Sequence, residues 1–280
     1  MMSAASRQWV MVGVLACAVS ACDRAPQQPA APAPAAVEAA PTVPAAPPPA
    51  TAPEDVVETT SDYVLGISYP GDAGRYPGLL AELRRYADGA RGELLAAVAD
   101  RKAQPGAPMY DLTLGFTKVS DSPSIVVIAA DGSTFTGGEQ SRPLLARFVW
   151  LVKENRLLTA AELVPDAASW NTISGEVRRQ LHMALAQRVD ADGLAVVERK
   201  AVLQRAGALI DAGTQPKPDS FASYEPVLTR DGKIGALRFV FPPYQVGSYA
   251  DGTQTVQLSA DVLLPHIAPR YRPMFAGTTG

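Results

Sequence analysis

The sequence predicts an α+β fold, with antiparallel sheets and a helical middle, preceded by a signal peptide and a disordered Ala/Pro tether. Two observations carry this prediction. Strand-like alternation of apolar residues is concentrated in two regions, 63–152 and 224–258, and helical spacing of apolar residues fills the region between them. Strands grouped in this way favour antiparallel sheets over a parallel doubly wound sheet, in which strands and helices alternate along the chain.

The first residues predict the signal peptide of a bacterial lipoprotein. Arg7 is the only charged residue before Cys22. The apolar run that follows it has about 13 residues, whereas a helix that spans a bilayer needs roughly 20. The run closes with Val19-Ser20-Ala21-Cys22, which resembles a lipobox, so residues 1–21 would be removed and Cys22 would carry lipid. Secretion with a free cysteine is the alternative, and cleavage before Cys17 would halve the apolar run.

The residue after the expected lipid site bears on location. Asp23 resembles the signal that retains lipoproteins in the inner membrane of enteric bacteria. We therefore expect a lipid-anchored protein on the periplasmic side of a bacterial membrane, with the inner membrane favoured. Loss of Arg7 changes the net charge from −3 to −4 (−3 − 1 = −4), which gives the mature chain no electrostatic reason to bind nucleic acid. Both cysteines lie at or before the cleavage site, so the folded part has no disulfide or thiolate chemistry.

Residues 22–58 predict a disordered linker. They consist mainly of alanine and proline and contain almost no bulky apolar side chain that could form a core. A segment of this composition samples polyproline II, which rises about 3.1 Å per residue. We expect it to act as a tether that lets the folded part work away from the membrane.

Residues 59–155 predict an N-terminal α+β subdomain. The alternating segment from Tyr63 to Tyr69 predicts a strand, and the leucines between Gly78 and Lys102 have helical spacing. Three segments then predict an antiparallel meander: Asp111–Val119, Ser124–Ala130 and Pro143–Val152.

Residues 156–268 predict a C-terminal domain, and residues 269–280 a tail. Thr159 and Glu162 fit a capping box that opens a short helix. The remaining predicted elements are two amphipathic helices (169–189 and 194–212), a hairpin with its turn at 229–233, a short strand (255–258) and a brief helix capped by Ser259.

Two groups of motifs carry a family resemblance. The first is Tyr69-Pro70, followed by a helix, two strands and Thr136-Gly137-Gly138; the second is Phe241-Pro242-Pro243-Tyr244-Gln245-Val246, followed by Tyr249-Ala250-Asp251-Gly252. Over residues 60–265 the chain resembles the RsiV-type anti-sigma factor ectodomain family, paired domains of unknown function that also accompany peptidoglycan deacetylases. The resemblance implies a non-catalytic extracytoplasmic binding domain, with lysozyme as a candidate partner because the anti-sigma ectodomain is a lysozyme receptor.

The chain departs from that family at one motif. The family often continues Gly-Gly with Ala-His, whereas Glu139-Gln140 follow Gly138 here, so a role for that histidine does not carry over. The anti-sigma relative also has a sigma-binding segment and a transmembrane helix, which we do not find in this sequence. We therefore expect extracytoplasmic binding and no direct contact with a cytoplasmic sigma factor.

The residue types do not favour catalysis, a metal or a cofactor. His182 and His266 are the two histidines, and no group of His, Cys, Asp and Glu has the spacing of a zinc site. The glycine-rich segment 132–138 continues with a glutamate where a phosphate-binding loop would place Lys and Ser/Thr. We expect the protein not to be an enzyme; an envelope hydrolase is the alternative with least support.

The candidate binding site combines two segments. Tyr244, Tyr249, Asp251 and Gly252 lie in an irregular segment, where tyrosines offer a rigid apolar face and a hydroxyl to a partner. The second segment, expected as their neighbour from the other subdomain, comprises Thr136, Gly137, Gly138, Glu139 and Gln140. The alternative is that the two tyrosines anchor the loop to the core while Asp251-Gly252 makes a turn.

The expected partner is a lysozyme-like muramidase or another peptidoglycan-acting enzyme. The mildly acidic mature chain suits a basic enzyme, although a charge of this size affects mainly the association rate. The alternative is a domain that binds peptidoglycan itself. Besides this partner, the expected contact is with the membrane, through the lipid on Cys22.

Overall fold

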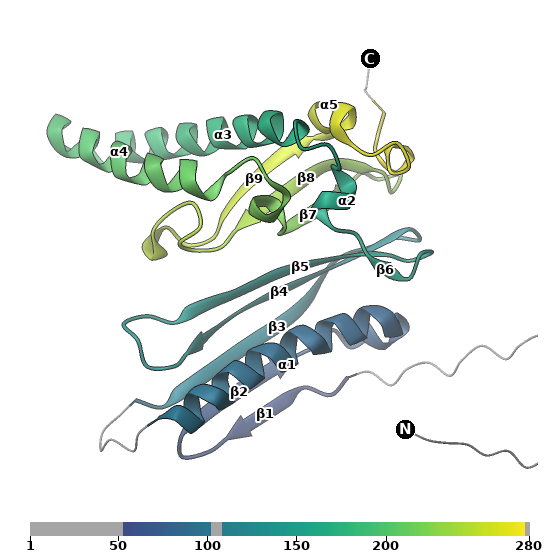
Figure 1. Ribbon diagram of the computed structural model, residues 1–280, viewed down its shortest axis with the longest axis vertical. Helices are drawn as coiled ribbons and strands as arrows, with labels where there is room; N and C mark the ends of the chain where they lie inside the picture. The colour runs from purple at the N-terminus through teal and green to yellow at the C-terminus, as the bar shows by residue number, and fades with distance from the viewer. Residues whose placement is uncertain (1–52, 102–107, 278–280) are drawn as a thin grey trace, which may run out of the picture. The chain divides into compact units, whose positions relative to one another are not determined.

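The computed structural model describes residues 53–101 and 108–277, all within one compact unit that spans residues 47–280. The predicted signal peptide, Cys22, Asp23 and most of the predicted tether lie outside the described residues. Helices and strands are mixed, with two sheets and a helical segment between them along the chain, so the predicted α+β class is confirmed (Figure 1).

The first sheet has six strands that neighbour one another in chain order. They are β1 (Val56–Thr59), β2 (Tyr63–Ser68), β3 (Tyr110–Asp121), β4 (Ile125–Phe135), β5 (Arg142–Leu151) and β6 (Arg156–Leu157). The predicted meander β3–β4–β5 is antiparallel throughout. The expectation of purely antiparallel sheets is wrong at one place, because β2 and β3 are parallel. The helix α1 (Pro77–Asp100) connects them and returns the chain to the same end of the sheet, as a parallel pair requires.

One glycine allows the central strands of this sheet to approach each other. Gly132 of β4 lies opposite Leu114 of β3, and a Cβ placed on it would lie 2.0 Å from the carbonyl oxygen of Thr113. No side chain fits at that distance. The glycine is therefore part of the packing of β3 against β4, and the strand predicted over 124–130 continues to Phe135.

The second sheet has three antiparallel strands, β7 (Tyr224–Leu228), β8 (Ile234–Phe241) and β9 (Gln254–Ser259). The predicted hairpin turn joins β7 to β8 and contains Gly232 at a φ of +77°. Four helices flank the sheet along the chain: α2 (Ala160–Leu163), α3 (Ser169–Ala191), α4 (Val196–Gly213) and α5 (Ala260–Leu263). In Figure 1, α3 and α4 form a hairpin beside β8 and β9.

Two predicted helix caps have different outcomes. The Thr159 hydroxyl accepts from the Glu162 amide, and the Glu162 carboxylate accepts from the Thr159 amide, which confirms the capping box at α2. Ser259 does precede α5 as predicted, but its side chain makes no capping hydrogen bond. Burial raises the pKa of Glu162, and the hydrogen bonds from Thr159 outweigh that effect, so its pKa lies below the ordinary value.

The core consists of two clusters that share β4 and β5. On one face of the first sheet, Val126, Ile128 and Phe148 pack with the apolar face of α1. On the other face, Val127 and Val149 pack with side chains of the second sheet and its helices, among them Trp170, Phe221 and Phe239. Because successive strand residues point to opposite faces, a strand covered on both faces is apolar throughout, which explains the continuous run at 125–130.

The folded part is longer at both ends than the sequence predicted. It begins at Val56 rather than near Thr59, because β1 pairs with β2 along its whole length. The predicted tail, 269–280, contributes to the core: Tyr271 and Phe275 are buried, and Phe275 forms a parallel bridge with Ile234. The Arg156 guanidinium donates to the Tyr271 hydroxyl at 2.8 Å, which ties this segment to β6.

Candidate functional site

The segment that joins β8 to β9, residues 242–253, is called the tyrosine loop here because it carries Tyr244 and Tyr249. Its return toward β9 is a tight turn: the Asp251 carboxylate accepts from the Ser248 amide and hydroxyl, each at 2.7 Å, and Gly252 follows at a φ of +65°. That φ lies in the left-handed region where glycine is unstrained. The turn that the alternative interpretation placed at Asp251-Gly252 is therefore present.

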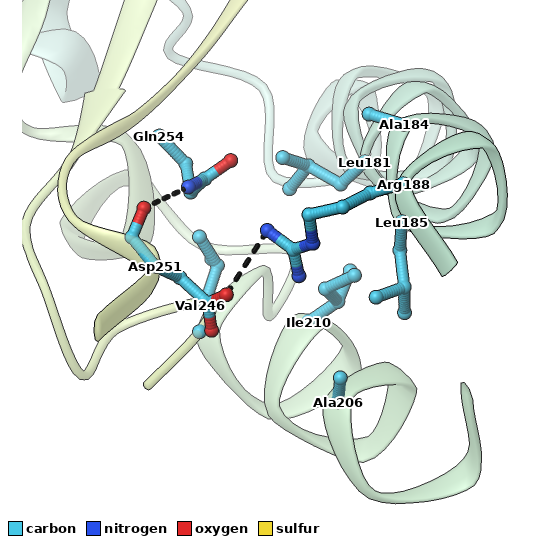
Figure 2. Close-up of a pocket in the computed structure, with 10 residues that line it drawn as sticks. Leu181, Ala184, Leu185, Arg188, Ala206, Ile210, Val246, Asp251 and Gln254 are labelled. Carbon is cyan, nitrogen blue, oxygen red and sulfur yellow. Dashed lines mark hydrogen bonds and ion pairs between the residues drawn. The ribbon is translucent and has the colours of Figure 1, made fainter. Parts of the chain in front are cut away.

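An ion pair holds this turn against the helical hairpin. The Arg188 guanidinium of α3 lies 3.0 Å from the Asp251 carboxylate, and the side-chain Nε2 of Gln254 donates to the Asp251 backbone carbonyl (Figure 2). Burial raises the pKa of Asp251, and the hydrogen bonds from Ser248 together with the charge of Arg188 outweigh it, so the pKa lies below the ordinary value. The carboxylate is therefore ionised at neutral pH and fixes the loop to α3.

The cavity that Figure 2 shows beside this ion pair is too small for a ligand. It lies between α3, α4 and the tyrosine loop, with Leu181, Leu185 and Ile210 among its lining residues, and has a volume of about 40 Å³. That is room for water at most, and far less than the roughly 300–1,000 Å³ of ligand pockets. We take it as a packing defect behind the loop.

The two tyrosines lie on the surface. Tyr244 is 57% exposed and Tyr249 38%, and their rings contact each other with centroids 5.6 Å apart. Tyr244 has a φ of +72°, a conformation that a residue with a Cβ adopts at a cost of about 1–3 kcal/mol. The alternative that they anchor the loop to the core does not describe this arrangement. The loop is instead ordered by Asp251, and it presents a pair of aromatic rings to solvent.

The structure brings the second predicted segment to the first. Thr136 to Gln140 lie between β4 and β5, and the Tyr244 hydroxyl donates to the Gln140 carboxamide oxygen at 2.6 Å. Gly137 has a φ of +88° and lies against the ring of Tyr110, so its role is to allow the turn between β4 and β5. Gln140 makes the side-chain contact to the tyrosine loop, and Glu139 is exposed beside it.

A cleft of about 350 Å³ lies between the tyrosine loop and the first sheet. Asp131 and Ser133 of β4 and Pro143 and Leu145 of β5 line one side; Asp131 pairs with Leu145 and Ser133 with Pro143 across the strands. The other side is lined by Pro243, Tyr249, Gly252 and Thr253. The lining is mixed, with polar and apolar surface in similar shares, and a cleft of this volume has room for a side chain or a small ring.

One end of the cleft adjoins a buried ion network. Arg147 of β5 donates to the Glu225 carboxylate of β7 at 2.6 Å and to the Asp131 carboxylate at 3.0 Å. The Arg147 and Glu225 side chains are only 7% and 8% exposed, whereas Asp131 is 56% exposed. Arg147 therefore orients Asp131 at the cleft and joins the two sheets at the same time.

The histidines do not form a catalytic arrangement. His182 contacts Asp211 across α3 and α4 at 3.0 Å. His266 contacts the Ser169 hydroxyl at 3.0 Å, and that hydroxyl donates to Asp166 at 2.8 Å, so the serine lies between the histidine and the acid. In a hydrolytic triad the histidine lies between the other two. Within the described residues, no group of three or more His, Cys, Asp or Glu could hold a metal ion.

Several residues of the cleft were not predicted. Asp131, Ser133, Pro143 and Leu145 lie in strands whose alternation was recognised, but alternation does not tell which stretch of a strand face remains uncovered. That depends on where the second sheet ends, which is a tertiary property. The one local feature of the sequence that points to the cleft is the Pro242-Pro243 pair, which ends β8 and starts the tyrosine loop.

The chain shares its fold with a solved structure of the DUF3298 family, a family of domains of unknown function. A family member from Pseudomonas aeruginosa is 16% identical, with 81% of this chain and 97% of that chain covered and a TM-score of 0.50. Another from Bacteroides fragilis is 13% identical, with 78% and 93% covered and a TM-score of 0.44. At these identities the likeness concerns the fold alone.

Comparisons of sequence add no family or activity. No protein-family model matches the chain, and no curated protein matches it. The described part of the chain contains no helix that is both long and apolar enough to cross a membrane. The fold and the site thus define a domain of unknown function with a surface cleft beside an ordered pair of tyrosines.

Proposed function

We propose that this protein is a lipid-anchored, extracytoplasmic binding protein without catalytic activity, and that its partner is a basic, peptidoglycan-acting enzyme such as lysozyme. The observation that carries the proposal is the ordered, exposed pair Tyr244 and Tyr249 beside a cleft that contains the carboxylate of Asp131. Tyrosines of this kind are common interface anchors. A carboxylate oriented by a buried arginine can accept a lysine or arginine of a basic partner.

The anchor is part of the proposal. The lipobox-like sequence at Val19–Cys22 and the Ala/Pro-rich segment after it support acylation of Cys22 and a location on the periplasmic side of a membrane, with the inner membrane favoured by Asp23. Two or more acyl chains give far firmer attachment than a single chain. Metabolic labelling of cells with a clickable fatty acid tests this: the wild-type protein should incorporate label, and label on Cys22→Ser would disprove the assignment.

Binding is tested on purified protein in detergent. We expect immobilised protein to retain lysozyme, and Tyr249→Ala to weaken binding by at least tenfold, as loss of an interface anchor does. Tyr76→Ala, which changes a partly buried tyrosine outside the site, is the matched control. Melting temperatures of all variants are measured alongside. A loss of affinity explained entirely by unfolding would remove the site, and no binding of lysozyme by the wild type would remove this partner.

The cleft itself supports a second candidate, peptidoglycan. Tyr249 and two prolines offer flat apolar surface, and Asp131, Ser133 and Thr253 offer groups that bind hydroxyls, which together suit a pyranose ring. Sedimentation with purified sacculi distinguishes the two. Co-sedimentation that Tyr249→Ala abolishes, without binding of lysozyme, would favour the glycan.

A further inference from the structure

The outer edge of β5 is largely unpaired. β4 pairs with β5 along its whole length, whereas β6 pairs only with Trp150 and Leu151. Beyond these, the Leu158 amide donates to the Val149 carbonyl at 2.8 Å. Within the described chain, residues 142–148 make no backbone hydrogen bond to a strand or loop other than β4. This stretch of edge therefore has no backbone partner within the described chain, although β7 lies beside β5 where Arg147 bonds Glu225.

The pairing pattern shows which backbone groups are free. In an antiparallel ladder the amide and carbonyl of one residue point to the same side, and the side alternates along the strand. The Val149 carbonyl points away from β4, so the backbone N–H and C=O groups of Leu145 and Arg147, which have the same parity, point away from β4 as well. Pro143 has the same parity but no N–H, so the open donors at this edge are two amides, followed by a proline that ends the donor row.

A hollow lies on each face of the sheet beside this edge. The cleft with Pro143 and Leu145 is on the face toward the second sheet. On the face toward α1 there is a groove of about 420 Å³ with Leu144 and Phe148 as its floor and Tyr86 and Gly89 of α1 on its wall. Its rim carries the exposed ion pair of Arg142 with Glu93. At the groove the rings of Tyr86 and Phe148 contact each other edge to face, and Gly89 leaves space that a side chain would fill.

We propose that this edge of β5 binds an extended peptide segment of a partner protein by strand addition. The free amides and carbonyls would hold the added backbone, and its side chains would point alternately into the two hollows. The groove floor favours apolar side chains at every second position. The cleft favours polar or basic ones between them, beside Asp131. This inference rests on the proposed function in one respect, namely that the partner is a protein.

Other occupants fit less well. The chain's own residues 22–58 are rich in proline, which lacks the donor that a strand needs. A second copy of β5 would bring its own Pro143, which has no N–H, and so would offer few donors to the edge. A glycan has no ladder of donors and acceptors to match the strand edge.

The test uses the full chain and a phage-displayed library of random 12-residue peptides as probe. We expect selected peptides to have apolar residues two positions apart, and to slow hydrogen exchange at the amides of Leu145 and Arg147. Gly89→Leu would fill the groove, and should weaken these peptides at least tenfold. A Cβ added at Gly89 or at Gly92 would have no atom within 4 Å, so both positions have space for a side chain. Gly92→Leu, on the same helix but outside the groove, is therefore the matched control and should bind the selected peptides as the wild type does.

The outcomes separate this inference from the proposed function. If no peptide is selected, or if selected peptides bind Gly89→Leu as well as wild type and leave Leu145 and Arg147 unprotected, the strand-addition site is disproved, whatever lysozyme does. If such peptides bind and lysozyme does not, the site stands and the proposed partner fails. A dimer in sedimentation equilibrium that Gly89→Leu dissociates would assign the edge to a second copy and overturn the proposal.

Discussion

At the scale of single residues, Arg147 links the core to the surface. Its guanidinium contacts a buried carboxylate on the second sheet and an exposed one at the cleft. Arg238 adds a further contact to Glu225 at 3.3 Å. Buried charges are tolerated only when their hydrogen-bonding capacity is satisfied. Loss of Glu225 would leave the buried Arg147 with the exposed Asp131 as its remaining acidic partner.

We predict that Glu225→Ala lowers the free energy of unfolding by about 3–5 kcal/mol, the range observed when one partner of a buried pair is removed. Glu93→Ala is the control, because its pair with Arg142 is exposed and should contribute about 1 kcal/mol or less. Urea denaturation of both variants measures the difference. Equal effects would show that the Arg147 network does not join the two sheets energetically.

Residue-level prediction from sequence succeeded where the interaction is local. Thr159 and Glu162 are three positions apart, so their reciprocal bonds depend on one turn of chain. The exposure of Tyr244 and its bond to Gln140 could not be decided in the same way, since 104 positions separate the two residues. The sequence indicated that two tyrosines and a turn occur in the same segment. That both tyrosines face solvent is seen only in the structure.

At the scale of elements, the long periodic segments could be predicted and the short ones could not. The helices α1, α3 and α4 and the strands β3, β4 and β5 each show several repeats of their period. β1 and β6 have four and two residues, too few for a period to appear. The parallel pairing of β2 with β3 follows from the path of α1 and has no sequence signal of its own.

The tyrosine loop is held at its start by the Gln245 carboxamide, which donates to the Gly213 and Ser220 carbonyls, and near β9 by the Asp251 carboxylate. We predict that Asp251→Ala increases hydrogen exchange over residues 244–252 and weakens partner binding at least fivefold, while the melting temperature changes little. The reason is that the turn and the tie to Arg188 are lost although the core is intact. Asp231→Ala removes a comparable carboxylate from the β7–β8 turn and should leave binding unchanged. Unchanged exchange in the loop of Asp251→Ala would refute this role.

At the scale of the whole molecule, stability should fall in acid. The Arg179 guanidinium, followed by the Gln180 amide, lowers the pKa of Glu176 from 4.5 to about 2. Asp72, Asp166 and Asp231 are lowered as well, through hydrogen bonds from Lys118, Ser169 and Thr229. A carboxyl whose pKa is lower in the folded state stabilises the fold above its unfolded pKa, and this contribution is lost as pH falls through the folded pKa.

We therefore predict that the melting temperature is nearly constant above about pH 5 and decreases between about pH 4.5 and 2. In Glu176→Gln the decrease should be shallower, because that carboxyl no longer takes up a proton on unfolding. Calorimetric scans across this range measure both. A wild-type melting temperature that rises as the pH is lowered would have the wrong sign for this account.

The last described residues are needed for the integrity of the molecule. Phe275 is 4% exposed and belongs to the cluster that contains both β4 and the second sheet. We predict that Phe275→Ala costs about 3–5 kcal/mol, the usual cost of such a cavity, whereas Val262→Ala, at a position 38% exposed, costs about 1 kcal/mol or less. Thermal unfolding of both variants provides the comparison. A small effect of Phe275→Ala would return this segment to the status of a tail.

The position of Phe275 also has a consequence for biosynthesis. The cluster that it completes includes Val127. This core therefore combines residues from the middle of the chain with a residue near its end, and it is incomplete until the last of them has been synthesised. A nascent chain can assemble α1 on the first sheet early, but the opposite face of β4 and β5 stays uncovered until nearly all of the polypeptide has emerged. During that interval an apolar sheet face is open to other chains, so a holdase that shields it should raise the yield of folded protein.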